Sequence, residues 1–163
     1  MSTWTEFGNS DPVTKFMTVT GGAVNFWTRP KTVSTGNFQN IKNYLVQTDP
    51  THLSLFFGSY SNSNTAVSMQ KYDINTGVWS APVDVITATN GYVYNNFRVD
   101  ANSNFGVTVA TGISTNGTPE AKAYQVSINN SVVGQQSVVE ANNVNQSLAV
   151  EGVHTNEDGS SYM

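Results

Sequence analysis

The chain repeats its own sequence three times, and the repeat length limits the folds that it can adopt. Two registers at a spacing near 52 residues carry the signal: Met17, Met69 and Ala121 in one, and Trp27, Trp79 and Ser131 in the other. A period in this range is typical of architectures in which each unit buries its apolar face only against a neighbouring unit. The 163 residues are therefore predicted to form an array of similar modules.

The residue pattern inside each repeat predicts β-strands. Apolar and polar residues alternate with a period of two, as where Leu53, Leu55 and Phe57 alternate with Ser54 and Phe56. Pairs such as Asn90-Gly91 and Asn116-Gly117 suit the turns between strands. In the middle repeat the pattern predicts four strands, at about 42–48, 52–60, 65–73 and 79–87. Four short strands per repeat describe one blade of a β-propeller.

The predicted fold is all-β: a β-propeller with three four-stranded blades in a single repeat domain, residues 1–163. Two blades lie at about 40–92 and 93–144, and the third is split between 145–163 and 1–39. Propellers commonly close their ring by pairing strands from both chain ends. They have four to eight blades, so we expect a homodimer with six blades, with a trimer as the other arrangement. The alternative fold is a β-trefoil monomer, whose threefold repeat closes within one chain.

One strand–turn–strand segment resembles a known repeat. Residues 71–82 read Lys-Tyr-Asp-Ile-Asn-Thr-Gly-Val-Trp-Ser-Ala-Pro. They resemble the Tyr-Asp-x-x-Thr-x-x-Trp run that joins the outer strands in sialidase-like (BNR-type) and kelch-like β-propellers. Here Asp73 is expected to accept hydrogen bonds from its own turn, Gly77 to adopt a positive φ, and Trp79 to cap the core between blades.

The resemblance does not imply sialidase activity. Such an enzyme grips the substrate carboxylate with three arginines, and this chain has two, Arg29 and Arg98. The histidines, His52 and His154, lie in turn-like segments with no sign of a catalytic triad. We therefore predict no enzymatic activity and no cofactor.

Composition excludes several partners. Seven basic residues are scattered along a chain of net charge −4, which argues against nucleic acid. No apolar run approaches the roughly 20 residues that a membrane helix needs, so membrane insertion is not expected. The uncharged, Asn- and Thr-rich composition, without a signal-peptide pattern at residues 1–6, favours an extracellular or virion-associated protein.

A metal site is not predicted either. Without cysteine the chain cannot form a disulfide or a zinc–thiolate site. Residues 100–106 alternate oxygen-bearing side chains as a calcium loop does. However, Gly106 falls one place late for the EF-hand pattern, and no glutamate follows at the required distance.

Carbohydrate recognition fits the residue types best. An aromatic ring can cover the apolar face of a pyranose while amides and charged groups bind its hydroxyls. The densest such segment is 90–98, and the full set of candidate ligand-binding residues is Tyr92, Tyr94, Asn96, Arg98, Trp79 and Trp27. The two tryptophans have a competing role as core anchors between blades. We predict a non-catalytic, lectin-like module that binds glycans with avidity as an oligomer. The alternative is a structural or assembly protein, such as a phage, surface-layer or designed propeller fragment.

Overall fold

The computed structural model describes part of the chain. Side chains are described for residues 43–58, 66–87, 97–114 and 150–162, and the backbone alone for 2–7, 12–17, 31–35, 59–61, 64–65, 91–93, 115, 118–126 and 132–140. These residues form strands and turns and contain no helix, so the all-β prediction is confirmed.

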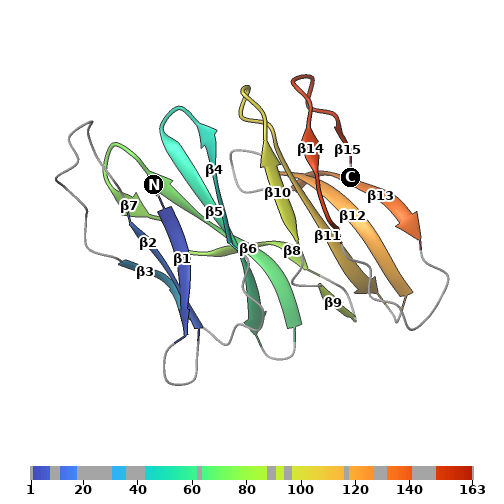
Figure 1. Ribbon diagram of the computed structural model, residues 1–163, viewed down its shortest axis with the longest axis horizontal. Helices are drawn as coiled ribbons and strands as arrows, with labels where there is room; N and C mark the ends of the chain where they lie inside the picture. The colour runs from blue at the N-terminus through green and yellow to red at the C-terminus, as the bar shows by residue number, and fades with distance from the viewer. Residues whose placement is uncertain are drawn as a thin grey trace.

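The strands form antiparallel sheets that lie side by side in a row (Figure 1). The first sheet has the order β1-β2-β3, with β1 at Ser2–Phe7, β2 at Pro12–Met17 and β3 at Lys31–Thr35. The second has the order β4-β5-β6-β7, with β8 also paired to β6: β4 Asn43–Asp49, β5 His52–Ser61, β6 Asn64–Asp73, β7 Val78–Trp79 and β8 Val83–Thr87.

The third sheet repeats the four-strand order of the second and is followed by a short hairpin. Its order is β10-β11-β12-β13, with β9 paired to β11: β9 Gly91–Val93, β10 Arg98–Ala101, β11 Val107–Thr115, β12 Thr118–Val126 and β13 Val132–Glu140. The hairpin joins β14, His154–Thr155, to β15, Ser161–Tyr162. β4 contacts β10, and β10 contacts β14, so the first strands of successive sheets are neighbours.

The four strands predicted for the middle repeat are confirmed to within one residue, except that the fourth is interrupted. It is divided into β7 and β8, both paired to β6. Pro82 lies in the break and has no N–H to donate to β6. Ser80 bridges it instead: its N–H donates to the Lys71 carbonyl at 2.8 Å, and its Oγ accepts the Lys71 N–H at 3.0 Å.

The turn between β6 and β7 has the hydrogen bonds that its sequence predicts. The Oδ1 atom of Asp73 accepts the N–H groups of Asn75 at 2.7 Å and Thr76 at 3.0 Å. Gly77 has a φ of +71° and donates its N–H to the Asp73 carbonyl at 2.8 Å. Both expectations for this turn are confirmed.

The centre of the second sheet, in β5 and β6, is buried on both faces. On one face its apolar side chains pack against the third sheet in a cluster of Phe56, Val67, Met69, Val85, Ile86, Phe97, Val107, Val109 and Ile113. On the other face Leu55 and Phe57 pack with Leu45 and Trp79. Ser54 in the same strand is also buried, and its hydroxyl pairs with that of Thr48 at 3.0 Å. Alternate residues of β5 therefore point to two buried faces of the sheet, and not to one buried and one solvent-exposed face.

We expect Gly77→Ala to lower the free energy of unfolding by about 1 kcal/mol, because an L-residue at this positive φ is strained. A Cβ here would meet the Tyr72 hydroxyl at an ordinary 3.6 Å, so the loss measures backbone strain rather than a clash. Gly152→Ala is the matched control, since a Cβ there meets nothing within 4 Å. Urea unfolding checks both variants, and equal stability of the two would contradict the role given to Gly77.

Candidate functional site

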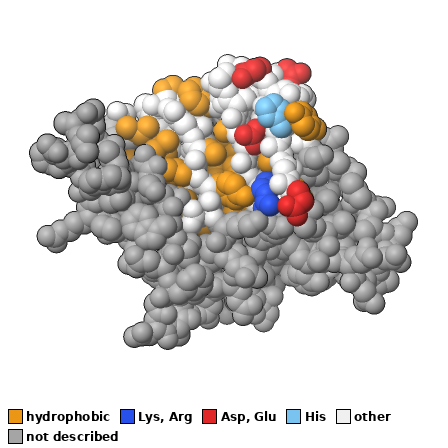
Figure 2. All heavy atoms as spheres, in the orientation of Figure 1, with side chains coloured by type: hydrophobic (Ala, Val, Ile, Leu, Met, Phe, Trp, Pro, Cys, Tyr) orange, Lys and Arg blue, Asp and Glu red, His pale blue; other side chains and the backbone are white. Residues whose placement is uncertain are grey.

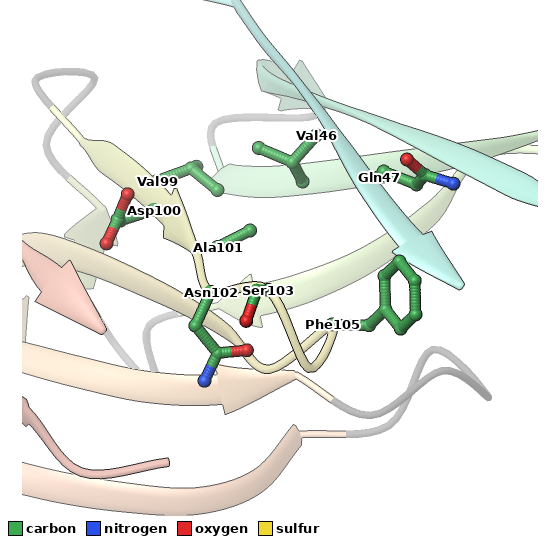
Figure 3. A pocket seen from close by; sticks show the side chains of 8 residues that line it. All are labelled: Val46, Gln47, Val99, Asp100, Ala101, Asn102, Ser103 and Phe105. Atoms are coloured by element: carbon green, nitrogen blue, oxygen red, sulfur yellow. The ribbon is translucent and has the colours of Figure 1, made fainter. Parts of the chain in front are cut away.

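A shallow pocket opens between the second and third sheets, where β4 ends and the β10–β11 hairpin turns. Its volume is about 540 Å³, and it is lined by Val46, Gln47, Val99, Asp100, Ala101, Asn102, Ser103 and Phe105 (Figure 3). Val46, Val99 and Ala101 belong to the edge of the core shared by the two sheets and give the pocket an apolar floor. Gln47 and Ser103 are exposed polar groups at its rim. In Figure 3 the Phe105 ring lies on the same side as Gln47.

The turn that forms one wall of the pocket is built around the side chain of Asn102. Its Oδ1 atom accepts the N–H groups of Asn104 at 3.0 Å and Gly106 at 2.7 Å. The Asn102 N–H closes the hairpin on the Gly106 carbonyl at 3.0 Å. A Cβ on Gly106 would lie 2.9 Å from the Asn102 Nδ2 atom, so glycine at this position lets the amide sit against the backbone.

The opposite side of the same hairpin is joined to the C-terminal segment by polar bridges. Asp100 Oδ2 accepts the Thr155 N–H at 2.7 Å, and Asn102 Nδ2 donates to the Asn156 carbonyl at 2.6 Å. The Glu157 carboxylate accepts the hydroxyl of Ser103 at 2.6 Å. The polar groups of Asp100, Asn102 and Ser103 are therefore engaged with this junction, and all three residues also line the pocket. Figure 2 shows acidic side chains on this part of the surface beside a histidine and a basic side chain.

A difference between equivalent residues explains why one junction is bridged and the other is open. In the register that aligns residues 43–46 with 96–99, Gln47 corresponds to Asp100 and Asp49 to Asn102. Asn102 donates an amide hydrogen to the next hairpin, whereas the carboxylate of Asp49 has no hydrogen to donate. Gln47 does not reach forward either, because its Nε2 donates to the Asp49 carbonyl at 3.1 Å. The space that such bridges would cross is the pocket.

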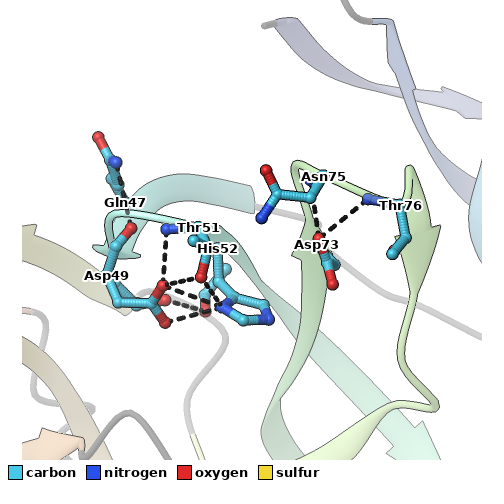
Figure 4. A network of polar contacts seen from close by, with 9 residues as sticks. Gln47, Asp49, Thr51, His52, Asp73, Asn75 and Thr76 are labelled. Carbon is cyan, nitrogen blue, oxygen red and sulfur yellow. Dashed lines mark hydrogen bonds and ion pairs between the residues drawn. The ribbon is translucent and has the colours of Figure 1, made fainter.

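Asp49 directs its carboxylate into its own turn (Figure 4). Oδ1 accepts the Thr51 N–H at 2.8 Å and the Thr51 hydroxyl at 2.7 Å, and the His52 Nδ1 atom lies 2.9 Å from both carboxylate oxygens. Burial alone raises the pKa of Asp49, but the hydrogen bonds from Thr51 and His52 outweigh it and lower the pKa to about 2. The carboxylate beside the pocket is therefore ionised at neutral pH.

This cluster is not a catalytic triad. In a triad the carboxylate binds one ring nitrogen of the histidine and the nucleophile binds the other. Here the Thr51 hydroxyl and the Asp49 carboxylate both contact Nδ1 of His52. The arrangement stabilises the β4–β5 turn and prepares no nucleophile.

Two residues of the sequence-predicted site have described side chains, and they lie in different places. Trp79 packs with Leu55 and Phe57, and its ring centroid lies 5.1 Å from that of Tyr72. Arg98 turns toward the C-terminal segment, where Nε donates to the Glu151 carbonyl at 3.1 Å and Nη2 lies 3.4 Å from the Glu151 carboxylate. Neither residue lines the pocket.

The other members of the predicted site are described in part or not at all. Tyr92 lies in β9, where the backbone pairs with Ser114 of β11, but its side chain is not described. Trp27, Tyr94 and Asn96 lie outside the described residues. Gln47 and Phe105, which line the pocket, are not among the residues predicted from the sequence. Phe105 carried one available signal, an aromatic residue within an Asn- and Gly-rich turn.

We expect Asp49→Asn to lower stability at pH 7 and to flatten its dependence on pH between 4 and 2. The pKa of Asp49 is about 2 in the folded chain, below its ordinary value of 3.8, so its ionised form stabilises the fold above about pH 4. This contribution is lost as the pH falls toward 2. Urea unfolding at several pH values checks the slope, with Glu151→Gln as a control because that carboxylate is 83% exposed. A parallel pH profile for Asp49→Asn and the wild type would contradict the assignment.

Comparison of the chain with models of protein families, with curated proteins and with solved structures finds no match. In the part of the chain that the structure describes, no helix is long and apolar enough to span a membrane. Within the same residues, no group of three or more His, Cys, Asp or Glu side chains could hold a metal ion.

Proposed function

We propose that the chain is a non-catalytic carbohydrate-binding module and that the pocket between β4 and β10 takes a neutral sugar. The observation that carries the proposal is the composition of the pocket: an apolar floor, one aromatic ring, and the exposed Gln47 and Ser103 at the rim. Carbohydrate sites combine an apolar surface with a few polar groups that bind hydroxyls. The described residues that line the pocket include no lysine or arginine, and the ionised Asp49 lies in the adjoining turn, which disfavours an anionic ligand.

The polar capacity of the rim supports this ligand class. Gln47 uses its Nε2 atom in its own turn and leaves the Oε1 atom to accept a hydrogen bond. Hydroxyl groups of a sugar are donors that match this acceptor. A shallow site of this kind binds weakly alone and gains affinity through repetition.

We also propose that the sheets are successive blades of a β-propeller of the sialidase-like or kelch-like kind. Two features support this. The four-strand paths β4-β5-β6-β7 and β10-β11-β12-β13 each draw their strands from one repeat, whereas a β-trefoil would pair strands of different repeats in a shared barrel. The first strands β4, β10 and β14 are neighbours in succession, as the inner strands of propeller blades are.

A second copy of the chain is the proposed partner that completes the ring. The first sheet and the C-terminal hairpin lie at opposite sides of the row (Figure 1). The ring of Tyr162, at the hairpin end, is 63% exposed. Pairing two rows about a twofold axis would cover these flanks and give six blades. The purely structural role remains the second candidate, because the polar bridges from Asp100 and Asn102 serve packing between hairpins.

Screening on a glycan array, followed by titration with methyl glycosides of the sugars that bind, tests the proposed function. Gln47→Ala is expected to weaken binding about tenfold through loss of one hydrogen bond. Its melting temperature should not change, because the side chain is exposed.

Asn75→Ala is the matched control, since it removes an exposed amide outside the pocket. Loss of binding in Tyr94→Ala but not in Gln47→Ala would move the site to the 90–98 segment. A wild-type chain that binds no sugar on the array would reject carbohydrate recognition and favour the structural role.

Light scattering tests the proposed assembly. We expect a molar mass about twice the 17.6 kDa of one chain. Tyr162→Ser should shift the equilibrium toward the monomer, because it removes an exposed apolar ring from the proposed interface. A wild-type monomer at all concentrations would contradict the assembly.

A further inference from the structure

Phe105 has a backbone conformation that aromatic residues rarely adopt. Its φ is +63°, in the left-handed region, and among the described residues it is the only residue other than glycine with a positive φ. A side chain in this conformation crowds the backbone, so the position favours glycine or asparagine. Strain of this kind persists where something else requires the residue.

The chain contains the same turn a second time, with glycine in the equivalent place. In the β10–β11 turn the Asn102 N–H donates to the Gly106 carbonyl and the Phe105 N–H to the Asn102 carbonyl. In the β14–β15 turn the Asn156 N–H donates to the Ser160 carbonyl and the Gly159 N–H to the Asn156 carbonyl. Gly159 has a φ of +83° and stands 54 positions after Phe105. The turn itself therefore does not need a side chain here.

Packing in the core does not account for Phe105 either. Its ring is half-buried, and it belongs to none of the apolar clusters of the described residues. It lines the pocket beside Gln47 instead (Figure 3). Gly159, the equivalent residue, lies in the β14–β15 hairpin, which polar bridges join to the β10–β11 hairpin. Phe105 instead faces the open junction between β4 and β10, where the pocket lies.

We propose that Phe105 is the stacking platform of the pocket, on which a hexopyranoside lays an apolar face that carries no axial hydroxyl. This inference rests on the proposed carbohydrate function. In a glucose-configured ring the hydroxyls are equatorial, and the axial C–H groups form a surface that an aromatic ring can cover. Gln47 at the rim then accepts a hydrogen bond from an equatorial hydroxyl. An axial hydroxyl on the stacked face would lie against the ring without a partner and weaken binding.

The matched variant is Phe105→Gly, which gives this turn the same residue type as Gly159 in the equivalent β14–β15 turn. Wild type and variant are titrated with methyl β-glucopyranoside, methyl β-galactopyranoside and methyl α-mannopyranoside by calorimetry and saturation-transfer NMR. We expect Phe105→Gly to lose at least tenfold in affinity for the glucoside. Its melting temperature should stay within about 3 °C of the wild type, because relief of backbone strain offsets the lost ring contacts. Phe105→Trp should retain binding.

The outcomes separate this inference from the proposed function. If the wild type binds one of the three glycosides and Phe105→Gly binds it equally well, the stacking role is wrong and sugar binding stands. If Phe105→Gly melts about 10 °C lower than the wild type, the Phe105 ring stabilises the fold as a core phenylalanine would, and the inference is overturned. If the wild type binds none of the three but binds another sugar on the glycan array, the inference about Phe105 is wrong and the proposed function stands. If it binds no sugar on the array, both fail.

Discussion

Leu55 and Phe56 are adjacent in β5, point to opposite faces of the sheet, and are both fully buried. A sheet with apolar side chains on both faces is stable in water only with a neighbour on each side. Phe56 packs into the cluster shared with the third sheet, and Leu55 packs on the other face with Trp79. The row of sheets, the contact between β4 and β10, and the pocket above that contact all depend on this two-sided burial.

The pocket lies where the core ends. Val46, Val99 and Ala101 sit at the margin of the shared cluster, so the floor of the site continues the packing that joins the sheets. Its walls come from two hairpin turns with different internal chemistry. The β4–β5 turn is closed by a carboxylate that binds its own backbone, and the β10–β11 turn by an amide that also binds the next hairpin. The scaffold thus supplies a rigid floor, and the turns supply the groups that could meet a ligand.

Local features of this fold could be predicted from the sequence, and relations between repeats could not. The strands of the middle repeat follow from alternation, and the roles of Asp73 and Gly77 follow from turn chemistry within five residues. The sequence pattern predicted one strand at 79–87 and missed its break at Pro82. Alternation alone does not show that β6 is the neighbour to which a residue at this position would donate its N–H. Arg98 lies in an aromatic segment, but its partner Glu151 is one repeat away along the chain. The pocket depends on a comparison of such distant pairs, and no local pattern marks it.

The contrast between Asp49 and Asn102 reduces to one chemical group. The amide nitrogen of Asn102, just after β10, ties the β10–β11 hairpin to Asn156. At the equivalent position Asp49 has a carboxylate oxygen, which binds its own turn and forms no such tie to the β10–β11 hairpin. Hydrolysis of the Asn102 amide, the ordinary chemical ageing of asparagine, would replace that nitrogen with oxygen. The aged chain would then lose a tie at its C-terminal junction.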